Sequence, residues 1–404
     1  MKRISLFLLL FLLLKATVMY SQDGHPETNF RIVPVSPNAA SLGTFGMIPT
    51  DNYVGQANLT IPIYEIDLDG KKFPIALSYH TDGTRVAQEA TWIGLGWTLQ
   101  AGGCVVRQVQ GTDDFAARGC YNLTDAPWLT NPRFEVTDQN LEKYMGYFKG
   151  DYDAEPDMFY FNAGGHSGSM YFDVLKNNRQ LNAVPTIQTQ EKVVKMVYNT
   201  SNKTWTMTDL EGYVYSFSTK EITYYFLNTI DFFQTDITRS HIFPYYNEPQ
   251  IVTAWMLDSV TSPNGGKITF SYKKESIFTP ISTTEDVISL SKIVNGQLSS
   301  QSPQYFTNKF NYNYSYSKIE QWTLSAITFE GGKVEFGTTD REDIESAETG
   351  KKVQKLSSIK VSDTAGNLIK TTMLEYKYLL SGMAATTNGY DDRLLLSKVY
   401  DVAG

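Results

Sequence analysis

The chain has 404 residues, 42% of them hydrophobic, which is enough for a large core and for more than one domain. Its 35 basic and 43 acidic residues give a net charge of -8 without a clustered basic run, which argues against a nucleic-acid partner. Aromatic residues make up 13% of the chain, including 26 tyrosines and 22 phenylalanines, and this composition favours β-strands.

Residues 1–22 have the pattern of a signal peptide. Lys2 and Arg3 precede an apolar stretch at residues 4–14, which is too short to span a bilayer comfortably. Cleavage near Gln22 would remove this stretch, and no later segment is long and apolar enough to be a transmembrane helix. The sequence therefore predicts an exported protein with no transmembrane segment after removal of the signal peptide.

The chain changes from polar to strand-like near residue 49. Residues 23–48 are rich in proline, asparagine and serine and predict an extended N-terminal arm. Residues 59–66 and 73–80 have strand-like composition, and Asp69-Gly70 between them is a hairpin turn signal. These strands open a predicted N-terminal β region that spans residues 49–250.

Residues 92–103 combine paired glycines with large side chains that alternate with small or polar ones. The alternation favours extended chain, and glycine permits a positive φ and the close approach of another backbone. A phosphate-binding loop would need Lys-Ser/Thr and a helix after the glycines, but residues 104–107 are β-type. We therefore predict a strand that bends sharply, with structural roles for Gly94, Gly96, Trp97, Gly102 and Gly103.

The chain has only two cysteines, Cys104 and Cys120, which flank residues 112–115. Export permits a disulfide, and we predict that the two cysteines pair. Two separate thiols are the alternative, because sequence does not place the Cβ atoms. Metal binding would need more ligands than these two.

The middle of the chain is less regular. Loop signals at residues 125–132 precede residues 137–148, which predict one short helix. Residues 158–162 and 169–174 then predict two strands around a glycine-rich turn.

Four units of one kind recur after residue 200. Each is a strand, a glycine-centred turn and a second strand, and the spacing between them is irregular, which is typical of a loose hairpin repeat. The units occupy residues 204–217, 257–270, 324–336 and 356–370. Between the second and third units, residues 274–317 are rich in Ser, Thr, Asn and Gln and predict a long excursion between hairpins.

The last eleven residues, 394–404, resemble the first half of the unit at residues 356–370. A strand that reaches its turn without a returning strand leaves backbone groups unpaired. We predict that residues 251–404 form a hairpin-repeat β region that is truncated at its C-terminus, with an exposed sheet edge there.

The predicted fold class is all-β. Successive antiparallel hairpins form a large curved sheet, either shell-like or sandwich-like, with at most one or two short helices.

Several of these segments, in their order and spacing, resemble the N-terminal region of secreted bacterial RHS/YD-repeat proteins. The chain is also similar to the opening domain of the B component of insecticidal toxin complexes. The array of YD repeats that normally follows is missing. The segments that carry the resemblance are residues 38–43, 59–63, 75–79, 94–103 with Arg107, 155–168 and 262–270.

The resemblance implies a non-enzymatic structural segment that starts or caps a β-shell around a C-terminal effector, often a toxin. The implied partners are the downstream YD-repeat shell and the effector of the same polypeptide. The implied location is extracellular or at the cell surface of a bacterium.

The sequence gives little support to catalysis, and no catalytic residue, cofactor or metal site is predicted. The histidines have no metal-binding spacing, and no Gly-x-Ser-x-Gly motif occurs. The four histidines are His25, His80, His166 and His241.

Two alternative functions remain open at this point. Exposed tryptophans could stack on sugars in a surface glycan-binding protein. The acids of residues 151–157, with Asp153 and Asp157 among them, could serve a glycoside hydrolase or supply oxygen ligands to Ca²⁺, as could Asp113 and Asp114. Turn capping and core packing are the competing structural roles. The tryptophans considered are Trp128, Trp205, Trp255 and Trp322.

Overall fold

A computed structural model describes most of the chain from residue 33 onward. It covers residues 33–45, 58–80, 88–122 except 112 and 118, 155–173, 182–188, 194–230, 250–289, 308–379 and 392–402, with a few isolated positions and two short strands at 293–298. The structure divides into two compact units. One comprises residues 1–31 and 110–156, and the other comprises residues 32–109 and 157–404.

The larger unit begins with helix α2 (Pro37–Phe45), where we predicted extended chain. Ser36 provides the N-cap, because its hydroxyl accepts a hydrogen bond from the Ala39 N–H at 3.2 Å. Pro37 occupies the first helical position, where a missing N–H costs nothing. The prediction of a fully extended arm was therefore wrong, because this capping outweighed the loop-like composition. The predicted signal peptide and nearly all of the predicted helix at 137–148 lie outside the described residues.

A three-stranded antiparallel sheet follows α2 in the chain. It contains β1 (Asn58–Leu68), β2 (Lys71–His80) and β3 (Trp97–Gln100) in that order. Asp69 and Gly70 both have positive φ, 51° and 90°, as a tight hairpin turn requires. The hairpin predicted at these residues is confirmed.

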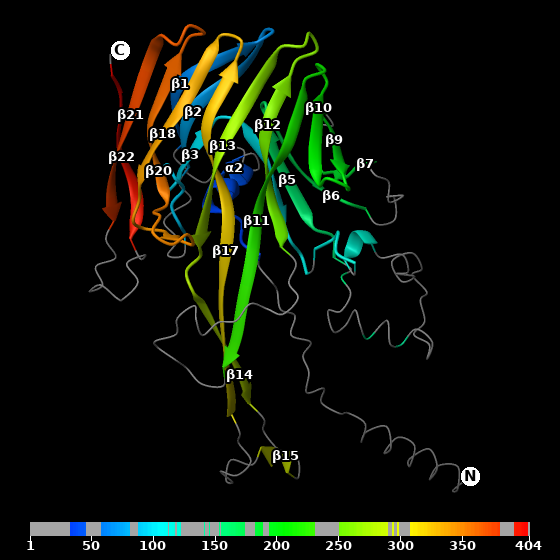
Figure 1. Ribbon diagram of the computed structural model, residues 1–404. Helices are drawn as coiled ribbons and strands as arrows, with labels where there is room; N and C mark the ends of the chain where they lie inside the picture. Colours follow the sequence, from blue (N-terminus) through cyan, green and yellow to red (C-terminus); the bar gives the residue numbers. More distant parts are fainter. Residues whose placement is uncertain are drawn as a thin grey trace. The chain divides into compact units, whose positions relative to one another are not determined.

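Most other strands belong to one large antiparallel sheet, so the all-β prediction is confirmed (Figure 1). The strands are β4 (Gly103–Gln108), β5 (Met158–Ala163), β6 (His166–Tyr171), β7 (Asn182–Ala183), β8 (Thr186–Ile187), β9 (Val194–Asn199), β10 (Thr204–Asp209), β11 (Val214–Ile230), β12 (Ile251–Thr261), β13 (Lys267–Phe278), β14 (Ser282–Ser289), β17 (Asn308–Phe329), β18 (Gly332–Asp340), β19 (Glu345–Ser346), β20 (Gln354–Ser362), β21 (Leu368–Leu379) and β22 (Arg393–Val402). A separate pair consists of β15 (Ile293–Val294) and β16 (Gln297–Leu298).

The large sheet branches at β12, and this branching makes room for α2. One edge of β12 pairs with β11, while its other edge pairs with β13 at residues 259–261 and with β4 at residues 254–256. Strand β13 leaves β12 after Thr269, while its other edge pairs with β17 from Thr269 to Phe278. Ala39 of α2 packs there against Cys104 of β4 and Met256 of β12, with Tyr272 of β13 and Trp322 of β17 beside them.

The four predicted hairpin units are present as β10–β11, β12–β13, β17–β18 and β20–β21. Strand β18 also pairs with β20, and β21 pairs with β22. Each later hairpin therefore extends the sheet by pairing with the edge strand before it. The predicted regions 49–250 and 251–404 share this sheet, because β11 and β12 pair across residue 250.

Within residues 274–317, the described segments 274–289 and 308–317 consist mostly of β-strands, where the polar composition predicted an excursion between hairpins. Strand β13 continues to Phe278, and β17 begins at Asn308, well before the predicted strand. The first half of β17 pairs with β11 on one edge and with β14 on the other, forming a three-stranded extension (Figure 1). Polar composition misled the prediction, because Thr and Tyr are good strand formers even where Ser and Asn lie between them.

The core of the large sheet is aromatic. Trp205 and Trp255 are both fully buried, and their ring centroids lie 6.1 Å apart in a T-shaped contact. Phe159 lies 5.3 Å from Trp205, and Tyr198 lies 4.7 Å from it. Trp205 and Trp255 therefore pack the core and are not available to stack on a sugar.

The smaller unit is described only in part. It contains the 3-10 turn η2 (Cys120–Asn122). Asp113 is buried, and its side chain accepts a hydrogen bond from the Phe115 N–H at 2.8 Å. Asp153 does the same for the Glu155 N–H at 2.9 Å. Both acids thus stabilise turns of the backbone.

Candidate functional site

The predicted bend forms a compact loop at residues 91–97, which we call the Gly94 loop. Its backbone has a positive φ of 117° at Gly94 and of 76° at Gly96. The Thr91 hydroxyl closes the loop, because its single proton is shared between the carbonyl oxygens of Trp97, at 2.7 Å, and Gly94, at 3.1 Å. This hydroxyl also accepts a hydrogen bond from the Ile93 N–H at 3.1 Å.

Both glycines of the loop are needed for close packing as well as for their positive φ. A Cβ atom at Gly94 would lie 2.9 Å from the backbone nitrogen of Leu396. A Cβ atom at Gly96 would lie 2.8 Å from the Tyr79 ring and 3.0 Å from the His80 carbonyl oxygen. Each position therefore excludes a larger residue on two independent grounds.

The second glycine pair brings the turn between β3 and β4 against two neighbouring strands. Gly102 has a φ of 102°, and a Cβ atom there would lie 3.3 Å from the Phe270 ring. A Cβ atom at Gly103 would overlap the Asn162 carbonyl oxygen of β5. Gly103 has no positive φ, so its constraint is space alone.

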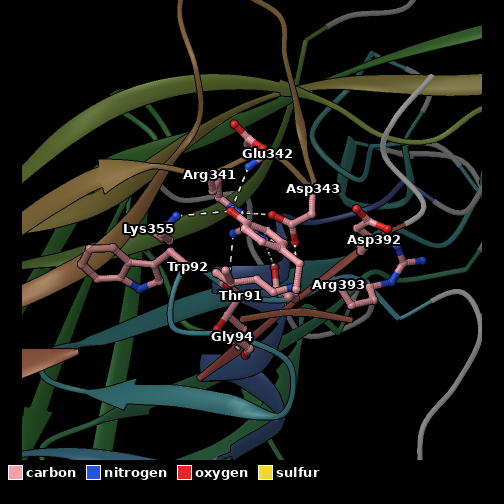
Figure 2. Close-up of polar contacts among 12 residues, drawn as sticks. Thr91, Trp92, Gly94, Arg341, Glu342, Asp343, Lys355, Asp392 and Arg393 are labelled. Atoms are coloured by element: carbon pink, nitrogen blue, oxygen red, sulfur yellow. Dashed lines mark hydrogen bonds and ion pairs between the residues drawn. The ribbon is translucent and has the colours of Figure 1, made fainter. Parts of the chain in front are cut away.

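A buried ion pair holds the start of the Gly94 loop (Figure 2). Arg341 and Asp343 are almost fully buried and form a two-bond pair, with Nε–Oδ1 and Nη2–Oδ2 distances of 2.8 and 2.7 Å. The Arg341 guanidinium also donates to the carbonyl oxygens of Thr91, at 3.0 Å, and Ala90, at 3.2 Å. One cation therefore satisfies one carboxylate and two backbone oxygens.

The Gly94 loop connects elements that are distant in sequence. The Leu95 N–H donates to the Leu394 carbonyl oxygen of β22 at 2.8 Å, and the Leu394 N–H donates to Asp343 at 3.0 Å. The Leu356 N–H of β20 donates to the Trp92 carbonyl oxygen at 3.0 Å. The Trp92 N–H donates to the Asn38 side chain of α2 at 2.8 Å. The loop thus joins α2, β20 and the beginning of β22.

Arg341 and Asp343 were missed by the sequence analysis. They lie in a short connection between β18 and β19, where charged residues are usually solvated. The sequence analysis predicted the bend at residues 92–103 but not the ion pair that holds it. No local pattern indicates that residues 250 positions apart meet.

The structure does not contain the predicted disulfide between the two cysteines. Cys104 and Cys120 are both buried, and no disulfide joins them. Cys104 packs in the cluster around α2, and burial raises the pKa of its thiol well above its ordinary value. Cys120 belongs to the smaller unit, at the start of η2.

The described acids considered for hydrolysis each have a structural partner. Asp157 is fully buried and forms an ion pair with Arg107, whose Nε lies 2.8 Å from Asp157 Oδ2. Asp153 caps a turn of the smaller unit. Trp322 donates to the Lys220 carbonyl oxygen at 2.7 Å, so its indole N–H is occupied by the sheet. Trp128, His25 and His241 lie outside the described residues.

A second polar cluster lies beside the β1–β2 hairpin. Lys71 Nζ lies 2.5 Å from Asp209 and 3.1 Å from Glu211. Burial opposes the charge on Lys71, but these two carboxylates raise its pKa above the ordinary value. His166 Nε2 lies 3.7 Å from Asp209, but burial and then the Lys71 charge lower the pKa of His166. The imidazole is therefore neutral at pH 7 and packs as a polar neighbour.

Two carboxyl groups lie in the interior near α2. Glu221 accepts hydrogen bonds from the Ser36 N–H at 2.9 Å and the Thr253 hydroxyl at 3.1 Å, and burial raises its pKa. Burial also raises the pKa of Glu275 to about 7, although a 3.4 Å hydrogen bond from Gln321 opposes this shift. In the described part of the chain, no group of three or more His, Cys, Asp or Glu side chains could hold a metal ion.

We expect Glu275 to make the stability of the fold depend on pH. Its pKa is raised in the folded chain, so the folded state binds more protons than the unfolded state between about pH 4.5 and pH 7. Stability must then fall as the pH rises through this window. We expect the Glu275→Gln variant to remove about 1 to 3 kcal/mol of this fall, at about 1.4 kcal/mol per pKa unit.

Urea unfolding at pH 5, 6, 7 and 8 measures this effect of Glu275. The exposed substitution Glu335→Gln on β18 is the matched control and should leave the pH dependence of the parent. Equal pH dependence in the parent and in Glu275→Gln would show that Glu275 does not carry the effect.

Comparisons with known proteins give structural similarity without a family assignment. The chain matches no protein-family model and no curated protein by sequence. Thirteen chains of solved structures match it. One is the N-terminal domain of the effector protein SpvB from Salmonella typhimurium strain LT2, with 12% identity, a TM-score of 0.37 and coverage of 86% of this chain and 99% of that domain.

Two others belong to toxin complexes. TcdB2-TccC3 has 10% identity and a TM-score of 0.40, with 92% of this chain and 16% of that chain covered. The Photorhabdus luminescens Tc holotoxin pore has 9% identity and a TM-score of 0.39, with 92% and 15% covered. The chain therefore spans only a small part of these toxin chains. At these scores the similarity assigns neither family nor function.

Among the residues that the structure describes, no helix is long and apolar enough to cross a membrane.

Proposed function

We propose that this chain is a non-enzymatic structural segment of an exported RHS/YD-repeat protein. In this role it starts or caps a β-shell that encloses a C-terminal effector or toxin. Its partners are the downstream YD-repeat shell and the effector of the same polypeptide. The observation that carries the proposal is the edge of the large sheet at β22.

Strand β22 has one paired edge and one edge that is closed only at its beginning. It pairs with β21 from Arg393 to Val402. On the opposite edge, the N–H and carbonyl groups of Leu394 bind Asp343 and the Gly94 loop. Among the described residues, β21 is the one strand with a residue-by-residue pairing to β22. An open edge of this kind is a template for a further strand.

The side chains near this edge also favour continuation of the sheet. Val402 is 44% exposed, and Ile369 of the neighbouring β21 is 55% exposed. The preceding hairpins were added edge to edge, β18 to β20 and β21 to β22. One more hairpin could therefore pair with β22 in the same edge-to-edge way.

The open edge predicts self-association of the chain when it is purified by itself. We expect concentration-dependent association in sedimentation velocity, and rapid hydrogen exchange at the alternate amides of residues 399–402 that point away from β21. The double variant Ile369→Lys/Val402→Lys should be monomeric at the same concentrations, because charges beside an edge oppose strand pairing. Both positions are exposed, so the cost in stability is small.

Leu210→Lys is the matched control, since Leu210 is 80% exposed in the turn between β10 and β11. It should associate like the parent. A monomeric parent in which the outward-pointing amides of residues 399–402 also exchange slowly would show that the edge is already satisfied, and the proposal would fail. In-frame YD repeats downstream of Gly404 in the genome provide a second test, and their absence would also contradict the proposal.

A further inference from the structure

The larger unit contains a cavity of about 150 Å³ between the three-stranded sheet and the large sheet. Strands β1 and β2 form one wall through Ile66, Phe73 and Ile75. Strands β13 and β17 form the opposite wall through Phe270 and Ile327. The cavity is independent of the β22 edge on which the proposed function rests.

Most of the cavity wall is apolar. Ile66, Ile75 and Ile327 are almost fully buried, so their side chains are fixed by the core around them. A volume of about 150 Å³ is large enough for a benzene-sized molecule, and apolar walls favour such a ligand. The volume and the lining therefore suit a small apolar ligand better than water.

Four glycines line one end of the cavity. Gly102 and Gly103 line it from the β3–β4 turn, and Gly164 and Gly165 line it from the β5–β6 turn. A Cβ atom at Gly102 would lie 3.3 Å from the Phe270 ring, so the turn lies directly against the wall. A Cβ atom at Gly165 would have no atom within 4 Å, whereas one at Gly164 would overlap the Tyr215 side chain.

The wall also contains polar groups that the fold does not use. Thr98 and Gln100 of β3 line the cavity. Within the described part of the chain, neither side chain has a hydrogen-bond partner. Asn162 uses its NH₂ group to donate to the Leu42 carbonyl oxygen at 3.1 Å, which leaves its amide oxygen as an acceptor. A polar substituent on a ligand could pair with these groups.

We propose that this cavity binds a small aromatic or aliphatic molecule that carries one hydrogen-bonding group. The apolar body lies between Ile75 and Ile327, and Gln100 and Thr98 bind the polar group. The cavity thus forms a ligand site within a structural protein.

Binding is measured with two probes that differ in one hydroxyl group, toluene and p-cresol. Calorimetry in sealed cells should show one saturable site for each, with p-cresol bound about three- to tenfold more tightly through its hydroxyl group. The nearly isosteric variant Gln100→Leu should remove most of that advantage and leave toluene binding within about twofold. Isoleucine methyl NMR should show ligand-induced shifts at Ile75 and Ile327, and none at Ile277, which lies in a separate cluster.

Ala101→Phe places a ring at the cavity wall and should abolish binding of both probes. Val184→Phe, at an exposed position away from the cavity, is the matched control and should retain binding. The absence of saturable binding to the parent protein, up to the solubility of toluene, would overturn the proposal. Shifts at Ile277 without shifts at Ile75 would overturn it as well. An unchanged p-cresol preference in Gln100→Leu would overturn the assignment of the polar group.

Discussion

Arg341→Leu should lower the free energy of unfolding by about 3 to 5 kcal/mol. The substitution leaves the buried Asp343 carboxylate without its cation, and it removes the donors to the carbonyl oxygens of Thr91 and Ala90. An uncompensated buried charge is among the costliest single defects in a fold. Urea unfolding at pH 7, followed by tryptophan fluorescence, measures the change.

Lys352→Leu is the matched control for this ion pair. Lys352 Nζ lies 2.9 Å from Glu342, which is the residue between Arg341 and Asp343. Both side chains of this second pair are more than half exposed. Its loss should cost less than about 1 kcal/mol. If Arg341→Leu and Lys352→Leu cost the same, the buried pair does not hold the Gly94 loop as described.

Gly94→Ala should destabilise the protein by about 2 to 4 kcal/mol, through backbone strain and through overlap with β22. An alanine at a φ of 117° is strained, and its Cβ atom would lie 2.9 Å from the Leu396 nitrogen. The same reasoning applies to Gly96→Val, which should prevent folding because valine is branched at Cβ. Thermal unfolding of both variants measures these effects.

Gly165→Ala separates strain from overlap. Gly165 also has a positive φ, 83°, but no atom lies within 4 Å of the position of a Cβ atom. Its replacement should therefore cost only about 1 kcal/mol, the effect of the backbone conformation. Equal costs at Gly94 and Gly165 would show that contact with β22 contributes nothing at Gly94.

The sequence predicted the local structure well where the signal was local. Asp69-Gly70 predicts its hairpin because only a few residues adopt a positive φ at low cost. The recurring hairpins were recognisable for the same reason, since each combines alternating strands with a glycine turn. The spacing of glycines around Leu95 indicated a bend, and the structure has positive φ at both Gly94 and Gly96.

The contacts that give the bend its role were not predictable from one sequence. Arg341 and Asp343 lie about 250 residues from Thr91 and have no local feature that distinguishes them from surface charges. Helix α2 was missed because its N-cap and first-turn proline also occur in loops. The cavity depends on the distance between two sheets, which periodicity within one strand does not encode.

Amide hydrogen exchange at Leu95, Leu356 and Leu394 tests most directly whether the Gly94 loop holds the edge of the last strand. These three N–H groups donate to the Leu394 carbonyl, the Trp92 carbonyl and the Asp343 carboxylate. If the loop is one unit, Arg341→Leu should raise their exchange rates by a common factor of at least about 100, relative to the Val260 amide in the core. Unchanged protection of Leu394 while Leu95 exchanges rapidly would contradict this account of how the sheet edge is held.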